Sequence, residues 1–473
     1  MYKEKLKKIK ENEYELPKIE EMLVPGKIFF SDEMIKNIEE ESLKQVKNVA
    51  CLSGIQKYSI GLADMHVGYG FPIGGVAAFD IEEGIVSPGG VGYDINCSVL
   101  LLRTNLKKED ILEKQEETAL LIQRKIPSGV GRGSPFNISK KEFLKVLERG
   151  AKYLIEKGYG KKEDYLYLEE EGCLTNAKSE KVSERALKRG IGQLGTLGAG
   201  NHFVDVQYVD EIFDKEISEI YGLKKNQIVI MIHCGSRGLG HQIASDYIQL
   251  MEKEYGIKNL PDRELINAPV KSKLGQDYLN AMACAANFAF ANKQLMLYWL
   301  REELKKIFPK IELEVVYEVC HNIAKIEEYL IDGKRKKVCV HRKGATRAFG
   351  PGRKEVPLDY RKAGQPVLIP GSMGTASYVL AGTKKAEELT FGSTVHGAGR
   401  IMGRRNAIRN LKYENLIKDL REKGIIVKSG SQKSLLEESP EAYKNIDEVV
   451  SVVHNLGISK KVAKLQPLIV IIG

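Results

Sequence analysis

The stretch NQIVIMIHCGSRGLGHQ, residues 226–242, shows most directly how this chain folds. Its first part, NQIVIMIH (226–233), is rich in β-branched and apolar side chains, which is typical of a buried strand. Gly235, Gly238 and Gly240 follow, and the segment 239–255 has the pattern of a helix. The stretch therefore predicts a strand and a helix joined by a glycine-rich turn, with His233 at the end of the strand.

The same alternation of short strands and charged helices continues along the chain. Further strands are predicted at 312–319, 337–341, 365–370 and 466–473, and helices at 32–48, 107–125, 139–157, 274–307 and 439–455. No linker-like composition and no internal repeat divides the chain. We therefore predict one large α+β domain over residues 1–473, with the charged segment at about 158–189 as the best candidate for a mobile excursion.

The composition limits the classes of protein to consider. With 473 residues, 43% hydrophobic and 29% charged, the chain can bury a large core, which excludes disorder as its main state. The net charge of +10 favours an acidic partner such as nucleic acid. The 7 cysteines are odd in number and lack a CxxC pair, which argues against a disulfide framework and suits a cytoplasmic location.

No membrane attachment is predicted. The N-terminal segment is basic but no apolar run follows it, so neither a signal peptide nor an anchor is expected. The most apolar long stretch, 279–300, contains Asn, Lys and Gln, and it therefore predicts a buried or amphipathic helix rather than a membrane span.

Six glycine-rich segments each place a polar functional residue beside a strand-like run. Asp94 and Cys97 lie three residues apart in one of them, so a carboxylate and a thiolate could face one cation. Histidines at similar strand ends, His202, His233 and His321, could add imidazoles. This ligand set suits Mn, Fe, Co or Zn rather than a site for Mg alone. The alternative is that these residues are satisfied core side chains.

A second set of residues is cationic. It lies in or next to the glycine-rich loops, where arginine suits bidentate recognition of RNA or DNA phosphates: Arg189, Arg237, Arg342, Lys343, Arg347, Arg353, Arg400, Arg404 and Arg405. The alternative for any one of them is an ordinary surface cation. Aromatic residues are poorly interleaved with these cations, so base stacking on an exposed sheet is not predicted.

His396, in the segment STVHGAGR, is a candidate nucleophile. A neutral imidazole can attack phosphorus and form a phosphoramidate that stores a nucleotide for transfer. A general base, a metal ligand and a structural histidine are the alternatives. Ser372 and Ser377, in the segment PGSMGTAS, could hydrogen-bond a nucleotide or form a glycine-rich turn into a strand.

These residues carry a resemblance to a known family. The chain contains, in a fixed order from about residue 55 to its end, the motifs GVGYDINC, GAGNHF, GSRGLGHQ, CHNIAK, HRKGATRAF, PGSMGTASYV and HGAGR. They resemble those of the RtcB family of RNA-splicing ligases. The resemblance implies a single α+β domain with a mixed β core, flanking helices and the active site in a central cleft. It also implies an enzyme that joins RNA 2′,3′-cyclic phosphate or 3′-phosphate ends to 5′-hydroxyl ends, in tRNA splicing or RNA repair, with two Mn²⁺ ions and GTP. An archease-like activator is a further family expectation.

The resemblance also assigns roles to residues of this chain. Cys97 would bridge two Mn²⁺ ions, with His202 and His233 completing one site and Asp94 and His321 the other, and His396 would accept GMP. The guanylate would lie among Asn201, Asp205, Ser372, Ser377, Gly397, Ala398, Gly399 and Tyr443. Arg189, Arg237 and Arg404 would bind RNA phosphates.

The chain departs from the family pattern at a few positions. Ile472 stands where a lysine that contacts the guanine nucleotide is typical, and Asp205 stands where glutamate is usual. Ser98, Leu100 and Cys234 replace residues common in the family, whereas all the implied metal ligands and His396 are present. The departures predict a divergent paralogue with altered GTP selectivity or a specialised RNA target. The alternatives are a protein that binds RNA ends without joining them and a metal-dependent RNA phosphoesterase.

Overall fold

Two large β-sheets form the centre of the computed structural model, which describes residues 1–129 and 131–473. In order across the first sheet, the strands are β1 (Lys7–Lys10), β2 (Glu13–Leu16), β3 (Gly26–Ile28), β4 (Ile55–His66), β5 (Ile73–Asp80), β13 (Lys334–Lys343) and β12 (Asn322–Ile331). The second sheet has the order β11 (Leu313–Cys320), β7 (Ser98–Lys107), β9 (Gln227–Cys234), β8 (Phe203–Ile212), β19 (Ser459–Ile472), β16 (Ser377–Gly382) and β15 (Pro366–Ile369), and β18 (Ile426–Ser429) pairs with β19. The pairs β3–β4 and β18–β19 are parallel and the other pairs within these sheets are antiparallel, so the predicted mixed β core is confirmed.

Two small sheets and a set of helices complete the domain. The small sheets pair β6 (Ile85–Val86) with β10 (Ala268–Pro269) and β14 (Ala345–Arg347) with β17 (Ser393–Val395). The helices are α1 (Asp32–Lys36), α2 (Glu40–Val49), α3 (Lys108–Leu112), α4 (Gln115–Lys125), α5 (Lys140–Glu156), α6 (Glu184–Ile191), α7 (Lys215–Ile220), α8 (Arg237–Tyr255), α9 (Lys273–Ile307), α10 (Lys384–Thr390), α11 (Arg404–Asn410), α12 (Tyr413–Glu422), α13 (Gln432–Glu437) and α14 (Ile446–Asn455).

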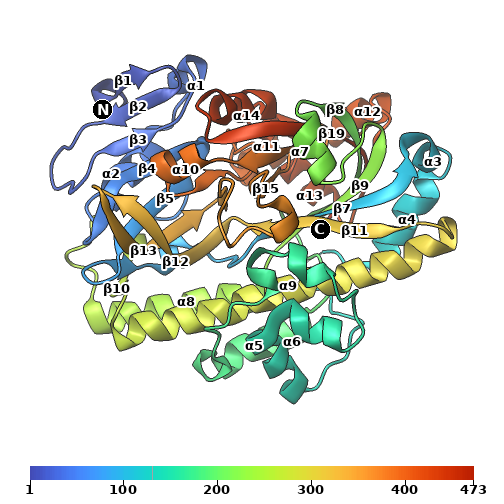
Figure 1. Ribbon diagram of the computed structural model, residues 1–473, viewed down its shortest axis with the longest axis horizontal. Coiled ribbons are helices and arrows are strands. Elements are labelled where there is room, and N and C mark those ends of the chain that lie inside the picture. The colour runs from blue at the N-terminus through green and yellow to red at the C-terminus, as the bar shows by residue number, and fades with distance from the viewer. Residues whose placement is uncertain (130) are drawn as a thin grey trace.

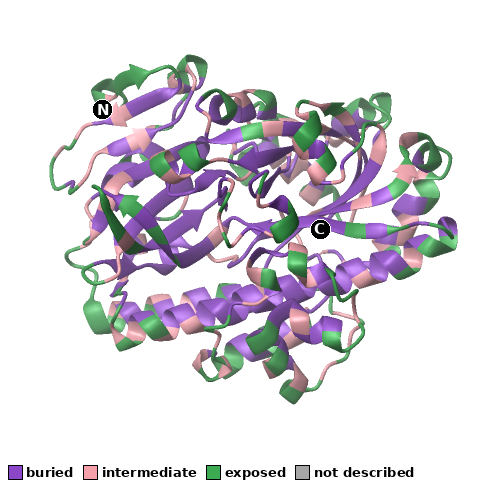
Figure 2. Ribbon diagram, viewed as in Figure 1, coloured by how far each residue is buried: buried purple, intermediate pink, exposed green. Residues whose placement is uncertain are grey.

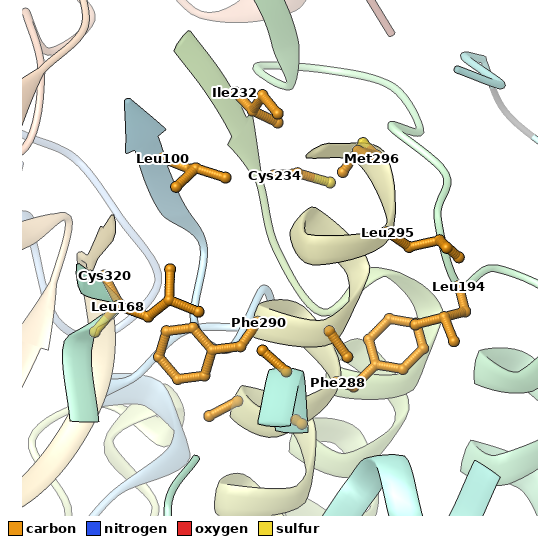
Figure 3. Packing of buried hydrophobic residues seen from close by; sticks show 14 of the residues in the cluster. Leu100, Leu168, Leu194, Ile232, Cys234, Phe288, Phe290, Leu295, Met296 and Cys320 are labelled. Atoms are coloured by element: carbon orange, nitrogen blue, oxygen red, sulfur yellow. The ribbon is translucent and has the colours of Figure 1, made fainter. Parts of the chain in front are cut away.

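The long helix α9 packs along the second sheet, with α5 and α6 on its other side (Figure 1). Alternate residues of β7 and β9 explain this layering, because successive strand residues point to opposite faces. Leu100 and Ile232 face α9, whereas Leu101 and Met231 belong to the core between the two sheets. Figure 3 shows Leu100 and Ile232 against Phe290 and Met296 of α9. The predicted α+β class is confirmed, with helices and two sheets in successive layers.

Helix α9 is buried along most of its length (Figure 2), as predicted for the stretch 279–300. Its polar residues have partners inside the protein: Asn292 Oδ1 accepts hydrogen bonds from the backbone N–H groups of Gly195 and Thr196 at 2.6 and 3.1 Å, and Lys293 Nζ donates to the carbonyl of Cys234 at 3.0 Å. No helix among the described residues is long and apolar enough to cross a membrane. These bonds tie α9 to the loops that precede β8 and follow β9.

The predicted strands all exist, and most have ends within a few residues of those expected, but the strand predicted at 466–473 is the longer β19, which already begins at Ser459. Three predicted helices were too long: 32–48 is divided into α1 and α2, 107–125 into α3 and α4, and 439–455 contains α14 after a short 3₁₀ turn at Pro440–Ala442. Residues 158–189 contain the 3₁₀ turns Asp164–Tyr167 and Glu169–Gly172 and bury Asp164 and Glu169. The mobility of this segment stays a prediction.

Candidate active site

The candidate metal ligands converge because β7, β8, β9 and β11 meet at one end of the second sheet. In this antiparallel arrangement, β7 and β8 begin where β9 and β11 end. Val99 and Phe203 are both opposite His233, and Cys320 is opposite Ser98. The candidate ligands stand at these positions or close to them. They are far apart in sequence, but the strand pairing places them side by side.

Five side chains form the metal cluster, defined here as Asp94, Cys97, His202, His233 and His321. Cys97 Sγ lies 3.2 Å from His233 Nε2 and 3.6 Å from His202 Nε2. His202 Nε2 lies 2.8 Å from Asp94 Oδ2, and His233 Nε2 lies 3.2 Å from His321 Nε2. Four of the residues are buried and Asp94 is half-buried, so donor atoms gather in one poorly solvated place.

The cluster divides into two groups that share Cys97. One is Cys97 with His233 and His321, and the other is Cys97 with Asp94 and His202; within each group the ligand atoms lie within 4.8 Å of one another. The resemblance implies another division, with His202 and His233 at one ion and Asp94 and His321 at the other, and the sharing of ligands between ions stays a prediction. His233 at the end of β9 faces the end of β11, whereas His202 turns toward the loop that carries Asp94.

Burial and the neighbouring charges shift the pKa values of the cluster. Burial, together with the charge of Asp94, raises the pKa of the Cys97 thiol to about 12. Burial and the neighbouring histidines lower the pKa of His233 and of His321 well below the usual value. Neutral imidazoles are the form that binds metal, and a cation would favour the Cys97 thiolate. The donor set therefore fits a transition-metal ion such as Mn²⁺.

A backbone carbonyl orients the imidazole of His202. His202 Nδ1 lies 3.0 Å from the carbonyl of Leu197, which directs Nε2 toward Asp94. The Leu197 loop is in turn held by Asn292 of α9 through Gly195 and Thr196. Such outer contacts fix the tautomer and orientation of a metal-binding histidine.

His396 reaches the cluster from a different part of the fold. It follows β17, and its ring centroid lies 5.1 Å from that of His321. Asp64, at the buried end of β4, binds His396 twice through Oδ2: the ring Nδ1 lies at 2.5 Å and the backbone N–H donates at 2.8 Å. If Nδ1 carries the proton, Nε2 keeps its lone pair and is held in one direction. A histidine with one ring nitrogen held by a carboxylate thus lies next to the candidate metal ligands.

Asp64 is a candidate functional residue that the sequence did not single out. It belongs to GLADMHVGYGFPIGG (61–75), which is one of the six glycine-rich segments. An aspartate in such a segment was the only sign of a role that the sequence offered. Its partner, His396, is 332 residues away in the chain.

A cleft of about 410 Å³ brings most of the candidates together. It is lined by the whole metal cluster and by His396, Asn201, Asp205, Ser372, Gly397, Ala398, Gly399, Arg404 and Tyr443. Ser377, Arg189 and Arg237 are not among the described residues that line it. Ser377 instead lies behind the loop that joins β15 to β16. Its Oγ accepts a hydrogen bond from the backbone N–H of Gly371 in that loop at 3.2 Å and another from Gln207 Nε2 at 3.1 Å.

The cleft also contains two of the positions where the chain departs from the family pattern, Ile472 and Asp205. Ile472 is buried in an apolar cluster with Met373 and Val470 and lines the cleft. Asp205 is buried, its Oδ1 has no hydrogen-bond partner among the described residues, and burial raises its pKa well above the usual value. This side of the cleft therefore offers an apolar wall and a buried carboxyl group with a raised pKa.

Several of the candidate phosphate-binding cations are structural instead. Arg342 is fully buried and paired with Glu327, Arg347 pairs with Glu170, and Arg353 pairs with Glu355. These arginines already have carboxylate partners within the protein, of which Glu327 is buried and Glu170 and Glu355 are half-buried, so the structure favours the alternative to RNA contact. Arg189 and Arg404 are exposed and Arg237 is half-buried, so they stay candidates for RNA phosphates.

The fold and the cleft are those of a metal-binding enzyme with a histidine held beside the metal ligands. A family profile described as tRNA-splicing ligase RtcB matches residues 45–473, and the chain belongs to this family, as its motifs predicted. It is 52% identical to the tRNA-splicing ligase RtcB of Archaeoglobus fulgidus, with 98% of each chain covered. Identity is also 52% to the protein of that name from Nanoarchaeum equitans, over 99% of each chain, and 50% to that from Methanococcus maripaludis, over 98% of this chain and 99% of the relative.

Proposed function

We propose that this chain is an RNA ligase that joins a 2′,3′-cyclic phosphate or 3′-phosphate end to a 5′-hydroxyl end in tRNA splicing or RNA repair, using GTP and two Mn²⁺ ions in the cytoplasm. The observation that carries the proposal is the position of His396: Asp64 holds its Nδ1 at 2.5 Å, and its ring lies 5.1 Å from the ring of His321. Membership of the RtcB family supports the same activity. An archease-like activator belongs to the proposal as a possible partner.

The metal cluster would hold the ions in its two groups. Cys97 with His233 and His321 would bind one Mn²⁺, and Cys97 with Asp94 and His202 would bind the other. Bound there, the ions would offset the negative charge that develops on phosphate oxygens during transfer. The shared Cys97 explains how two ions could share so small a volume, since a thiolate can bridge them.

His396 is the proposed nucleotide acceptor. Asp64 keeps the proton on Nδ1 and stabilises the positive charge that the ring gains when Nε2 attacks the α-phosphorus of GTP. The new N–P bond replaces the bond to pyrophosphate, which leaves. His396 then carries GMP through a phosphoramidate bond.

Two further displacements complete the reaction. An oxygen of the RNA 3′-phosphate attacks the phosphorus on His396, so the N–P bond breaks and an RNA(3′)pp(5′)G end forms. The 5′-hydroxyl of the second RNA then attacks the 3′-phosphorus, loses its proton, and GMP departs. A 2′,3′-cyclic end is first opened by water to a 3′-phosphate. Each step is an attack on phosphorus within one cleft, which is why nucleophile, metal ligands and cations converge there.

The remaining cleft residues are proposed to bind the two substrates. Asn201, Asp205, Ser372, Gly397, Ala398, Gly399 and Tyr443 would surround the guanylate, with Ser377 supporting the loop from below. Arg189, Arg237 and Arg404 would bind RNA phosphates on the way into the cleft. The apolar Ile472 and neutral Asp205 provide less charge for guanine recognition than the usual lysine and glutamate would, so weakened selectivity for GTP is part of the proposal.

Labelling with α-³²P GTP and Mn²⁺ tests the nucleotidyl step. We expect an acid-labile label on the wild-type protein and none on His396→Ala, and an equal label from ATP would show that guanine selectivity is lost. Absence of label on the wild type would overturn the His–GMP step. RNA with cyclic-phosphate and 5′-hydroxyl ends then separates three activities: a joined product supports ligation, gel retardation without joining indicates an RNA-end-binding protein, and loss of the terminal phosphate indicates a phosphoesterase.

A further inference from the structure

Three aromatic rings form a row at the mouth of the cleft. Tyr69 and Tyr93 both line the cleft, and their rings meet edge to face with centroids 6.4 Å apart. Tyr93 in turn stacks on His241 of α8, with centroids 4.9 Å apart and planes 28° from parallel. The row is assembled from three separate segments, so the sequence, in which aromatic residues and arginines are poorly interleaved, did not predict a stacking surface.

Tyr69 is the exposed end of this row, although its backbone is held in place. Its side chain is 68% exposed, which is unusual for a large aromatic ring that has no structural task. The Tyr69 carbonyl accepts a 2.6 Å hydrogen bond from the buried amino group of Lys343. Gly70 follows with φ +70°, packed against the backbone of Glu264 so closely that a Cβ there would lie 2.8 Å from its carbonyl. An exposed ring on an anchored loop can bind a flat ligand at little cost in entropy.

The other end of the row lies among cations on the expected path of the RNA. His241 is next to Gln242, whose side-chain oxygen accepts a hydrogen bond from Arg189 at 2.9 Å. Arg237 is the first residue of the same helix, and its Nη1 lies 3.5 Å from Nδ1 of His202 in the metal cluster. Aromatic rings beside a cationic track are typical of surfaces that bind single-stranded nucleic acid, because phosphates meet the cations while bases stack on the rings.

We propose that Tyr69 is a base-stacking residue for a single-stranded RNA end, with Tyr93 and His241 fixing its position. This inference rests on the proposed function for its ligand class. Stacking on Tyr69 would hold the nucleotide next to a reacting end at the mouth of the cleft, while the end itself enters toward Cys97 and His396. The contact is to the face of the base, so it tolerates any base.

Fluorescence of 2-aminopurine tests this inference directly. The probes are two single-stranded RNA oligonucleotides, one with a 3′-phosphate and one with a 5′-hydroxyl, each carrying 2-aminopurine in the two nucleotides nearest that end. They are mixed with the Mn²⁺-loaded protein without GTP, so that no transfer occurs. We expect the wild-type protein to quench the fluorescence of at least one of the two oligonucleotides. Tyr69→Ala should abolish this quenching and weaken RNA binding about 10-fold. Tyr69→Phe should restore both the quenching and the RNA affinity.

Two controls separate stacking from general effects. Tyr255→Ala removes another exposed tyrosine, 44% exposed and outside the cleft, and should leave RNA affinity unchanged. An abasic nucleotide at the quenched position should bind the wild type as weakly as intact RNA binds Tyr69→Ala. Equal affinity and quenching for wild type and Tyr69→Ala would overturn the inference. Quenching by a wild type that takes no label from GTP would instead overturn the proposed function and leave the stacking site standing.

Discussion

Two groups of buried ionisable residues lie close together in this fold and differ in how well they are paired. The metal cluster at the end of the second sheet is one. The other is an ion-pair layer, defined here as Glu169, Glu170, Lys325 and Arg347 with the neighbouring pair Arg342 and Glu327. The two touch through β11, since the carboxylate of Glu169 accepts a 2.7 Å hydrogen bond from the backbone N–H of Cys320, the residue before His321.

The ion-pair layer satisfies its charges internally. Arg342 binds Glu327 through two parallel hydrogen bonds of 2.7 Å, and it also donates to Ser393 Oγ and to the carbonyl of Phe391, each at 2.8 Å. Lys325 lies 2.6 Å from Glu169 and 2.9 Å from Glu170. In this layer each buried charge faces an opposite charge, which is what allows it to stay ionised away from water.

The metal cluster is only partly paired in this way. Asp94 has an ion-pair partner in His202, whereas the thiol of Cys97 and the imidazoles of His233 and His321 contact one another. The comparison teaches that burial of a titratable group does not by itself mark function. A complete set of partners indicates a structural role, whereas potential metal ligands that face one another indicate a binding site.

Removing the thiol shared by the two groups should have the largest effect. Cys97 belongs to both ligand groups, so Cys97→Ala should lower RNA joining by about 10⁴-fold or more and eliminate bound metal. The free energy of unfolding of the metal-free protein should change little, because the thiol is not paired with a structural partner. Metal analysis, a joining assay and denaturation of the EDTA-treated protein measure the three quantities.

Cys284→Ala is the matched control, since Cys284 is an equally buried thiol in α9 outside the cleft. It should keep metal and joining activity. Full metal content in Cys97→Ala would contradict the assignment of the cluster as a metal centre.

Breaking the ion-pair layer should instead cost stability. Arg342→Met leaves the buried carboxylate of Glu327 without its partner, and the free energy of unfolding should fall by about 3–5 kcal/mol. Replacing both residues, Arg342→Met with Glu327→Leu, should recover much of this loss because no unpaired charge remains. Chemical denaturation measures both variants. If Arg342→Met alone were as stable as the wild type, the ion-pair layer would not depend on charge pairing, and it would not differ from the metal cluster in this respect.

Helices and strands could be predicted from the sequence where the pattern that defines them extends over only a few neighbouring residues. The run NQIVIMIH became β9, and the apolar stretch 279–300 became the centre of α9, because β-branched runs and helical periodicity act over a few residues. Helix ends were less accurate: the helix predicted from residue 439 begins at Ile446, since Pro440 starts a separate 3₁₀ turn.

The site could be predicted only as far as motif and residue type extend. The metal ligands share one cleft with His396, but their division between two groups depends on strand register, which spacing does not reveal. Asp64 and Tyr69 were missed because their partners lie in distant segments. Arg342 was assigned to RNA because nothing near it in sequence shows that Glu327, on the neighbouring strand, would bind it.

The pH dependence of stability gives a finer comparison, starting with the ion-pair layer. The charge of Lys325 holds the pKa of Glu170 well below its usual range. Ionised Glu170 therefore stabilises the fold above the unfolded-state pKa of about 4.3, and this contribution is lost as pH falls below that value. Glu170→Gln should be less stable than wild type at pH 7 by about 2 kcal/mol, with the difference shrinking toward pH 3. An equal difference at both pH values would indicate a loss of packing instead.

Asp205, in the cleft, should behave in the opposite sense. Burial raises its pKa well above the usual value, and Gln207 Nε2 at 3.2 Å is a neutral partner. The folded protein therefore retains a proton that the unfolded chain releases above about pH 3.9, so stability is lost as pH rises past that value. Asp205→Asn keeps the shape without the charge and should raise the free energy of unfolding of the metal-free protein by about 1 kcal/mol at pH 7, with no gain near pH 3. Lower stability of Asp205→Asn at pH 7 would mean that the carboxylate is ionised and paired, as in the ion-pair layer. A gain confined to neutral pH would show that the cleft keeps an unpaired acid at a cost to folding, which is expected of a group reserved for a ligand.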